Sequence, residues 1–83
     1  MKLLYFAWVR ERVGHGEEDV SVPADVDTVG ALMRWLSERG DGYAAAFAEA
    51  GKVRAAVDQA HVGPDADIRD AREVAFFPPV TGG

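Results

Sequence analysis

The 83-residue sequence predicts an α+β fold in which a mixed β-sheet packs on one main helix. Two observations lead to this prediction. Apolar runs rich in strand-forming residues occupy residues 2–9 and 73–77, near the two ends of the chain. Between them, residues 28–39 repeat apolar side chains at the spacing of one helical face. A chain of this length forms one modest core, so residues 1–83 are expected to be a single domain from which residues 78–83 protrude as a tail.

The first third of the chain is expected to form two antiparallel strands. Residues 2–9 (KLLYFAWV) are predicted as a strand because the run is too short for a well-packed helix, and both faces of this strand would be apolar. Residues 14–16 (GHG) then provide the turn of a hairpin. Residues 19–22 alternate polar and apolar side chains until Pro23 ends the second strand.

The middle of the chain predicts two helices. The main helix is capped by Asp27 or Thr28, and a second, short helix is predicted for residues 43–50 (YAAAFAEA), with Phe47 as its anchor. The main helix should cover the sheet with one apolar face, which is made of Val29, Leu32, Met33 and Leu36.

The C-terminal third is expected to complete the sheet. Residues 52–59 are predicted as a strand, with residues 61–62 as a short continuation, and Ile68 is a core candidate. Residues 73–77 form the last strand, which Pro78 ends because proline has no N–H to donate. The first and last strands are apolar on both faces, so they are expected to pair in parallel at the sheet centre. This order of elements is that of the ubiquitin-like β-grasp fold.

The composition narrows the possible functions. The chain has no cysteine, which excludes disulfides, thiolate metal sites and a cysteine nucleophile, and the cytoplasm is the expected location. Fourteen acidic residues against nine basic ones make nucleic acid an unlikely partner, and no segment is apolar enough to suggest a membrane span. His15 and His61 have no ligand partners at metal-binding spacing, so no metal site is expected. A phosphate-binding glycine loop is also absent from the sequence.

The C-terminal tail is the most unusual feature of the sequence. Pro78 and Pro79 should direct the chain out of the sheet in an extended conformation, and the four residues from Val80 onward could carry the terminal carboxylate about 13 Å further. Gly82 and Gly83 have no side chains, so only a narrow backbone need enter the active site of another protein. A frayed terminus without function is the alternative.

The tail also carries a family resemblance. The ending FFPPVTGG, the opening YFAWVRERVG and the internal AAVDQ together resemble the small, sulfur-carrying subunits of molybdopterin synthase, which belong to the ubiquitin-like ThiS/MoaD superfamily. The resemblance spans the whole chain. It implies that Gly83 is the catalytic residue: an activating enzyme related to ubiquitin-activating enzymes would adenylate its carboxylate with ATP, and a sulfur donor such as a cysteine desulfurase or a rhodanese would convert it to a thiocarboxylate.

The resemblance further implies a large subunit of molybdopterin synthase as the main partner, in a heterotetramer. The thiocarboxylate would donate its sulfur to precursor Z, a cyclic pyranopterin monophosphate, to form the molybdopterin dithiolene. This chain would hold no cofactor, because ATP is used by the activating partner. It would also catalyse little alone. Matched residue by residue, the flexible, extended tail comprises Gly82, Thr81, Val80, Pro79 and Pro78, and the partner-binding contacts are Phe6, Arg10 and Phe77.

Four positions depart from the family pattern, and two other functions stay open. Asp58 replaces an expected Asn and could weaken a turn hydrogen bond, while His61 and the pair Ala71-Arg72 make the interface details less certain. Residues Phe6 and Phe77 could also be ordinary core residues. The alternative functions are a carrier of sulfur for thiazole or another thiolated product, against which FFPP argues, and a ubiquitin-like binding module with an inert tail.

Overall fold

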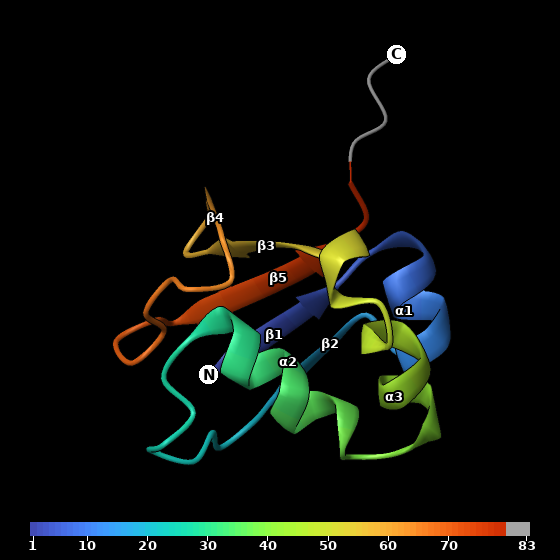
Figure 1. The fold of residues 1–83 in the computed structure, drawn as a ribbon, viewed down its shortest axis with the longest axis horizontal. Helices are drawn as coiled ribbons and strands as arrows, with labels where there is room; N and C mark the ends of the chain where they lie inside the picture. The colour runs from blue at the N-terminus through green and yellow to red at the C-terminus, as the bar shows by residue number, and fades with distance from the viewer. Residues whose placement is uncertain (80–83) are drawn as a thin grey trace.

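The computed structural model describes residues 1–79, which form a five-stranded mixed sheet with helices on one face. Figure 1 shows α2 and α3 in front of the sheet and β5 in its middle. The strand order is β2-β1-β5-β3-β4, in which β1 and β5 are parallel and the other neighbours are antiparallel. Along the chain the elements are β1 (Lys2–Tyr5), α1 (Ala7–Val13), β2 (Glu17–Asp19), α2 (Val29–Ser37), α3 (Asp41–Phe47), the 3₁₀ helix η1 (Ala50–Lys52), β3 (Arg54–Val57), β4 (Ala60–Val62) and β5 (Glu73–Phe77).

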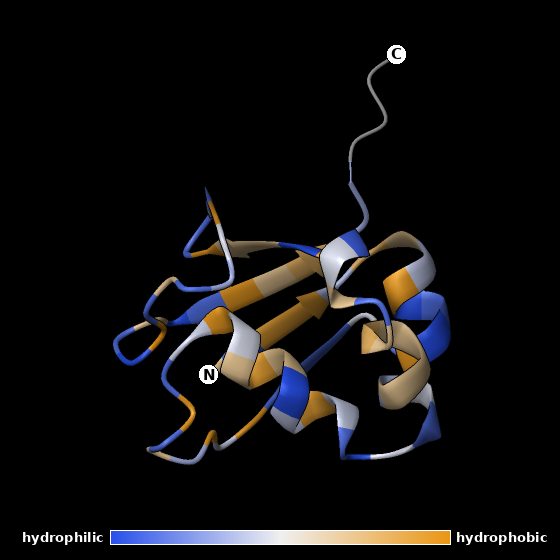
Figure 2. Cartoon of the chain, in the orientation of Figure 1, coloured by the Kyte–Doolittle hydropathy of each residue, from blue (hydrophilic) through white to orange (hydrophobic). Residues whose placement is uncertain are grey.

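The centre of the sheet is the parallel pair that the sequence predicts. Leu3 lies opposite Val74 and Tyr5 opposite Phe76, and all four side chains are buried beneath the helices. Figure 2 shows β1 and β5 as mostly apolar ribbons behind α2. The predicted bounds of β5 agree with the structure, and the arrangement is the expected β-grasp.

Helix α2 covers the sheet as expected. Thr28 is its N-cap residue, and the Thr28 hydroxyl accepts a hydrogen bond from the backbone N–H of Ala31 at 3.1 Å. All four residues of the predicted apolar face are buried. Phe47 of α3 is also buried and meets the ring of Phe76 edge-on at 5.0 Å, and Ile68 is buried as predicted. The core therefore lies between α2, α3 and one face of the sheet.

The prediction for residues 2–9 is wrong beyond Tyr5. The strand ends there, Phe6 takes the extended N-cap position of α1, and Ala7 has a φ of 51° that turns the chain into the helix. Strand propensity is overridden by packing, because Val9 of α1 is buried in the core. A helix, and not a tight turn at residues 14–16, thus joins the first two strands.

Several other boundaries also differ from the predictions. The second strand is β2 and not residues 19–22, and α3 begins and ends earlier than residues 43–50. The predicted strand of residues 52–59 is shortened at both ends: η1 precedes it, and Asp58 and Gln59, with φ of 47° and 73°, turn the chain into β4.

Asp58 also fixes the start of the last strand. Its Oδ1 atom accepts the backbone N–H groups of Arg72 and Glu73, each at 3.0 Å. The carboxylate that replaces the expected Asn therefore makes these turn hydrogen bonds itself.

A hydrogen-bond cluster centred on Glu18 holds the loop after α1, the segment after α2 and helix α3 together. The hydroxyl groups of Tyr5 and Tyr43 donate to Oε2 of Glu18 at 2.8 and 2.6 Å. His15 Nε2 lies 3.0 Å from the same oxygen, and Arg39 donates to Oε1 at 3.1 Å. Four side chains from different segments thus converge on one carboxylate beside the core.

The cluster shifts the pKa values of its members. Burial acts to raise the pKa of Glu18, but the hydrogen bonds from Tyr43, His15, Tyr5 and Arg39 outweigh it and lower that pKa from 4.5 to about 2. Burial and the hydrogen bond to Glu18 raise the pKa of Tyr43 to about 12, and the same two causes raise the pKa of Tyr5. Glu18 is therefore ionised and both tyrosines are protonated at neutral pH.

Candidate functional site at the base of the C-terminal tail

The sheet face opposite the helices carries an apolar surface. Side chains alternate along a strand, so the neighbours of the buried Leu3, Tyr5 and Phe76 point away from the core. Phe6 continues this alternation, and with 49% of its surface exposed it is the only large apolar residue that is exposed among residues 1–79. We call this surface the open-face patch; its residues are Leu4, Phe6, Ala56, His61, Ala75 and Phe77.

Two alanines lie in the middle of the open-face patch. Ala56 of β3 lies opposite Ala75 of β5 and opposite His61 of β4, and both alanines are nearly inaccessible although they lie outside the core cluster. Small residues between larger ones leave a shallow apolar surface on which another protein could pack.

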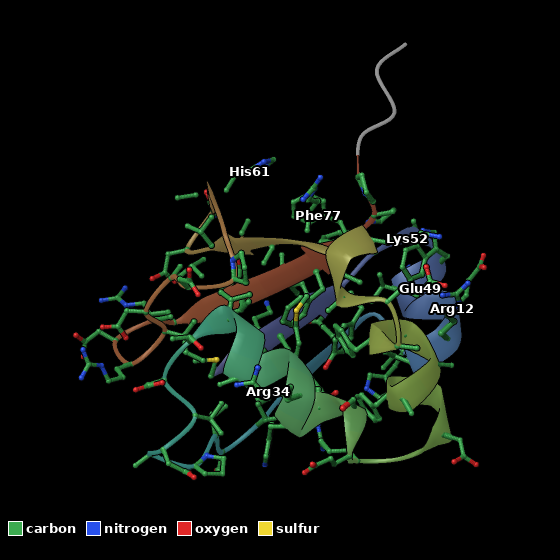
Figure 3. All side chains as sticks on the ribbon, in the orientation of Figure 1. Arg12, Arg34, Glu49, Lys52, His61 and Phe77 are labelled. Atoms are coloured by element: carbon green, nitrogen blue, oxygen red, sulfur yellow. The ribbon has the colours of Figure 1, made fainter. Side chains whose placement is uncertain are left out.

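Phe77 lies at the end of the open-face patch, where the tail begins. Its ring is half-buried, and the ring of His61 packs against it at 5.1 Å (Figure 3). Arg54 pairs with Phe77 across the sheet. Pro78 ends β5 as the sequence predicts, and both Pro78 and Pro79 are partly buried.

Arg10 lies beside Phe6 at the edge of this surface. It is one helical turn further along α1, its backbone N–H donates to the Phe6 carbonyl, and its side chain extends over Gly16. Phe6 lies close to the base of the tail, because its backbone N–H donates to the carbonyl of Phe76 at 3.0 Å, whereas the Arg10 side chain lies on the β2 side of β1. The predicted tail residues Val80, Thr81, Gly82 and Gly83 lie outside the described residues.

Sequence reasoning did not propose Leu4, Ala56 or Ala75 of the open-face patch, nor the neighbouring Arg54, as site residues. It treated His61 as a departure from the family and not as part of this surface. The two-residue alternation of β3 and β4 was the signal available for them, because it places His61 and Ala56 on one face. Residues 1–79 contain no group of three or more His, Asp or Glu side chains that could hold a metal ion.

A family model described as the ThiS family matches residues 3–83. The chain belongs to the ThiS family. A protein named molybdopterin synthase sulfur carrier subunit from Escherichia coli K12 is 48% identical over 83 residues, which cover 100% of this chain and 99% of that protein. A protein of the same name from Haemophilus influenzae is 35% identical with the same coverage.

Two solved structures have a similar fold. One is described as a molybdopterin converting factor subunit 1 from Pyrococcus furiosus, with a TM-score of 0.74, 28% identity and 95% coverage of both chains. The other is SAMP1 from Haloferax volcanii, with a TM-score of 0.69, 24% identity and coverage of 100% of this chain and 98% of that one. The second likeness shows the fold alone. Within the part of the chain that the structure describes, no helix has the length and apolar character to cross a membrane.

Proposed function

We propose that this chain is the sulfur carrier subunit of molybdopterin synthase. The observation that carries the proposal is the 48% identity, over essentially the full length of both chains, to a relative with that name. The FFPPVTGG ending and the open-face patch beside it fit this function. Little catalysis is expected from the chain alone, because it would supply the reacting sulfur while its partners supply the remaining machinery.

The chemistry requires an activated C-terminal carboxylate. A free carboxylate is a poor electrophile, so the activating enzyme would use ATP to convert the carboxylate of Gly83 to an acyl adenylate, with release of pyrophosphate. The terminal sulfur of a persulfide on a donor protein would then displace AMP to form an acyl disulfide, and a thiol would reduce this disulfide and release the thiocarboxylate. This anionic sulfur is a nucleophile that attacks the pterin precursor within the large subunit. Val80 to Gly83 would provide the reach, and the absence of side chains on Gly82 and Gly83 would let the backbone pass.

The open-face patch is the proposed docking surface for the large subunit. Phe6 is exposed, so it is not a core residue. An exposed phenylalanine in an apolar surface is typical of an interface. Phe77 is at the start of the tail, so docking there would orient the tail as well as hold the two subunits together. Arg10 would add a polar contact at the edge.

Intact mass spectrometry tests this function. Incubated with the activating enzyme, ATP and a sulfur donor, the protein should gain the mass difference between sulfur and oxygen, and a variant that lacks Gly83 should not. Addition of the large subunit and precursor Z should then return the carrier to its original mass and produce molybdopterin. A charged carrier that loses its sulfur only to a thiazole synthase would assign it to the thiazole branch. No mass gain with an active enzyme and a folded carrier would contradict both functions.

A further inference from the structure

A second surface lies on the other side of the sheet, where α2, η1 and β3 enclose a groove of about 380 Å³. Its floor and walls are mainly apolar, with Met33 from α2, Val53 between η1 and β3, and Val62 and Pro64 from β4 and the loop after it. The volume falls in the range of binding sites in proteins. The groove lies on the helix side of the sheet and the open-face patch on the other, so the proposed sulfur-carrier function leaves the groove without a role.

The charge of the groove is opposite to that of the molecule. The chain has a net charge of −5, yet none of the fourteen residues that line the groove is acidic. Arg34 carries the charge of the groove, because Arg54, which also borders it, lies opposite Phe77 and directs its side chain to the open face. Arg34 has no carboxylate within 4.0 Å among residues 1–79. Figure 3 shows Arg34 on α2, at the front of the molecule. Such a groove is complementary to an apolar segment that carries negative charge.

The sheet edge beside the groove favours an extended peptide over a compact small molecule. Strand β4 pairs only with Ala55 to Val57 of β3, so among the described residues Val53 and Arg54 have no strand neighbour on that side. An extended peptide can add to an uncovered strand edge through its backbone. The helix that forms the opposite wall lines the groove from Val29 to Ser37, a length of about 12 Å, which about four extended residues would span.

We propose that this groove binds an extended acidic peptide segment of a partner protein. Two aliphatic side chains of the peptide would enter the apolar floor, and a carboxylate of the peptide would pair with Arg34. The site differs from the open-face patch, so the peptide could be bound while the patch is occupied. This proposal does not depend on the sulfur-carrier function.

The test is a titration of the ¹⁵N-labelled full chain with the acetylated and amidated peptide Val-Ile-Val-Asp-Asp, followed by NMR. Saturable shifts are expected at the amides of Gly30, Gly51 and Gly63, which line the groove. The variant Gly51→Trp should abolish binding while it keeps the fold, because a side chain at Gly51 meets no atom within 4 Å. Gly63→Phe, equally open, blocks the groove from the opposite wall. Arg34→Gln should weaken binding about fivefold.

Matched controls separate this proposal from its alternatives. Ala44→Trp on α3 and Arg72→Gln introduce the same changes at exposed sites outside the groove and should leave the affinity unchanged. The proposal is overturned if the peptide gives no saturable shift at millimolar concentration, if both blocking variants bind it normally, or if its shifts fall on the open-face patch. Equal affinity for a peptide with lysines in place of the aspartates, or for isovalerate alone, would also overturn it, the latter in favour of a small-molecule site.

Discussion

Replacement of Glu18 by Gln should destabilise the protein substantially, although the side chain keeps its size. The pKa of Glu18 is lowered from 4.5 to about 2, and at about 1.4 kcal/mol per pKa unit this sets an upper limit of about 3 kcal/mol. The Glu18 side chain is only 16% exposed, so solvent screens the cluster weakly. Because Gln can still accept one of the tyrosine hydrogen bonds, we expect a loss of about 2 kcal/mol at pH 7 and a fall in Tm of about 10 °C.

The pH dependence of the free energy of unfolding shows whether the ionised carboxylate of Glu18 is the cause of this loss. A carboxylate whose pKa is lowered by folding stabilises the protein above its unfolded pKa of 4.5, and this stabilisation is lost as the pH falls toward 2. Urea denaturation, followed by circular dichroism, should therefore show a large difference between wild type and Glu18→Gln at pH 7 and a smaller one at pH 3. The neighbouring Glu17→Gln is the control, because Glu17 is exposed and forms only a surface ion pair with Lys2. A difference below about 0.5 kcal/mol at pH 7, or one that is equal at both pH values, would refute the reasoning.

Three further predictions follow from the backbone and the open-face patch. Gln59→Gly should raise the free energy of unfolding by about 0.5–1 kcal/mol, because glycine adopts the positive φ of this turn without strain; an unchanged urea midpoint would contradict it. Gly42→Ala should cost about 2 kcal/mol in the same assay, since its methyl group would collide with the backbone carbonyl of Arg12 where α3 contacts α1, and a neutral effect would show that the two helices can separate freely. Phe6→Ala should change the unfolding free energy little but weaken binding to the large subunit at least about tenfold in calorimetry; unchanged affinity would exclude Phe6 from the interface.

Periodicity made the centre of this fold predictable. The spacing of apolar residues located α2, and the runs that are apolar on both faces identified β1 and β5 as the central parallel pair. The proline after Phe77 fixed the end of β5 because its cause is local and absolute: proline has no N–H.

The elements that were missed depend on single backbone angles and on tertiary contacts. The break after β1 requires a positive φ at Ala7, and the turn after β3 requires positive φ at Asp58 and Gln59, none of which is a glycine. Turn prediction from sequence relies on glycine at such positions, so these turns gave little signal. Helix α1 forms because Val9 reaches the core, which depends on residues distant in the sequence.

The candidate site was predictable only in part. Phe6, Arg10 and Phe77 came from the family resemblance, and the structure adds the exposure of Phe6 and the alanine pair beside it. The groove could not have been predicted, because its walls come from α2, η1, β3 and the loop after β4. These segments are distant in the sequence, and no local sequence pattern indicates that they lie side by side.

Because β5 is the central strand, the folded docking surface can form only after β5 has been translated. It is the last strand to leave the ribosome, yet β1 and β3 can join one sheet only through it. A nascent chain that stops before residue 73 therefore lacks the strand on which both halves assemble, and it cannot form the native domain. An enzyme that requires the folded surface for docking would thus bind only chains whose translation has passed through β5. Incomplete chains would not bind, and no separate quality-control step would be needed to exclude them.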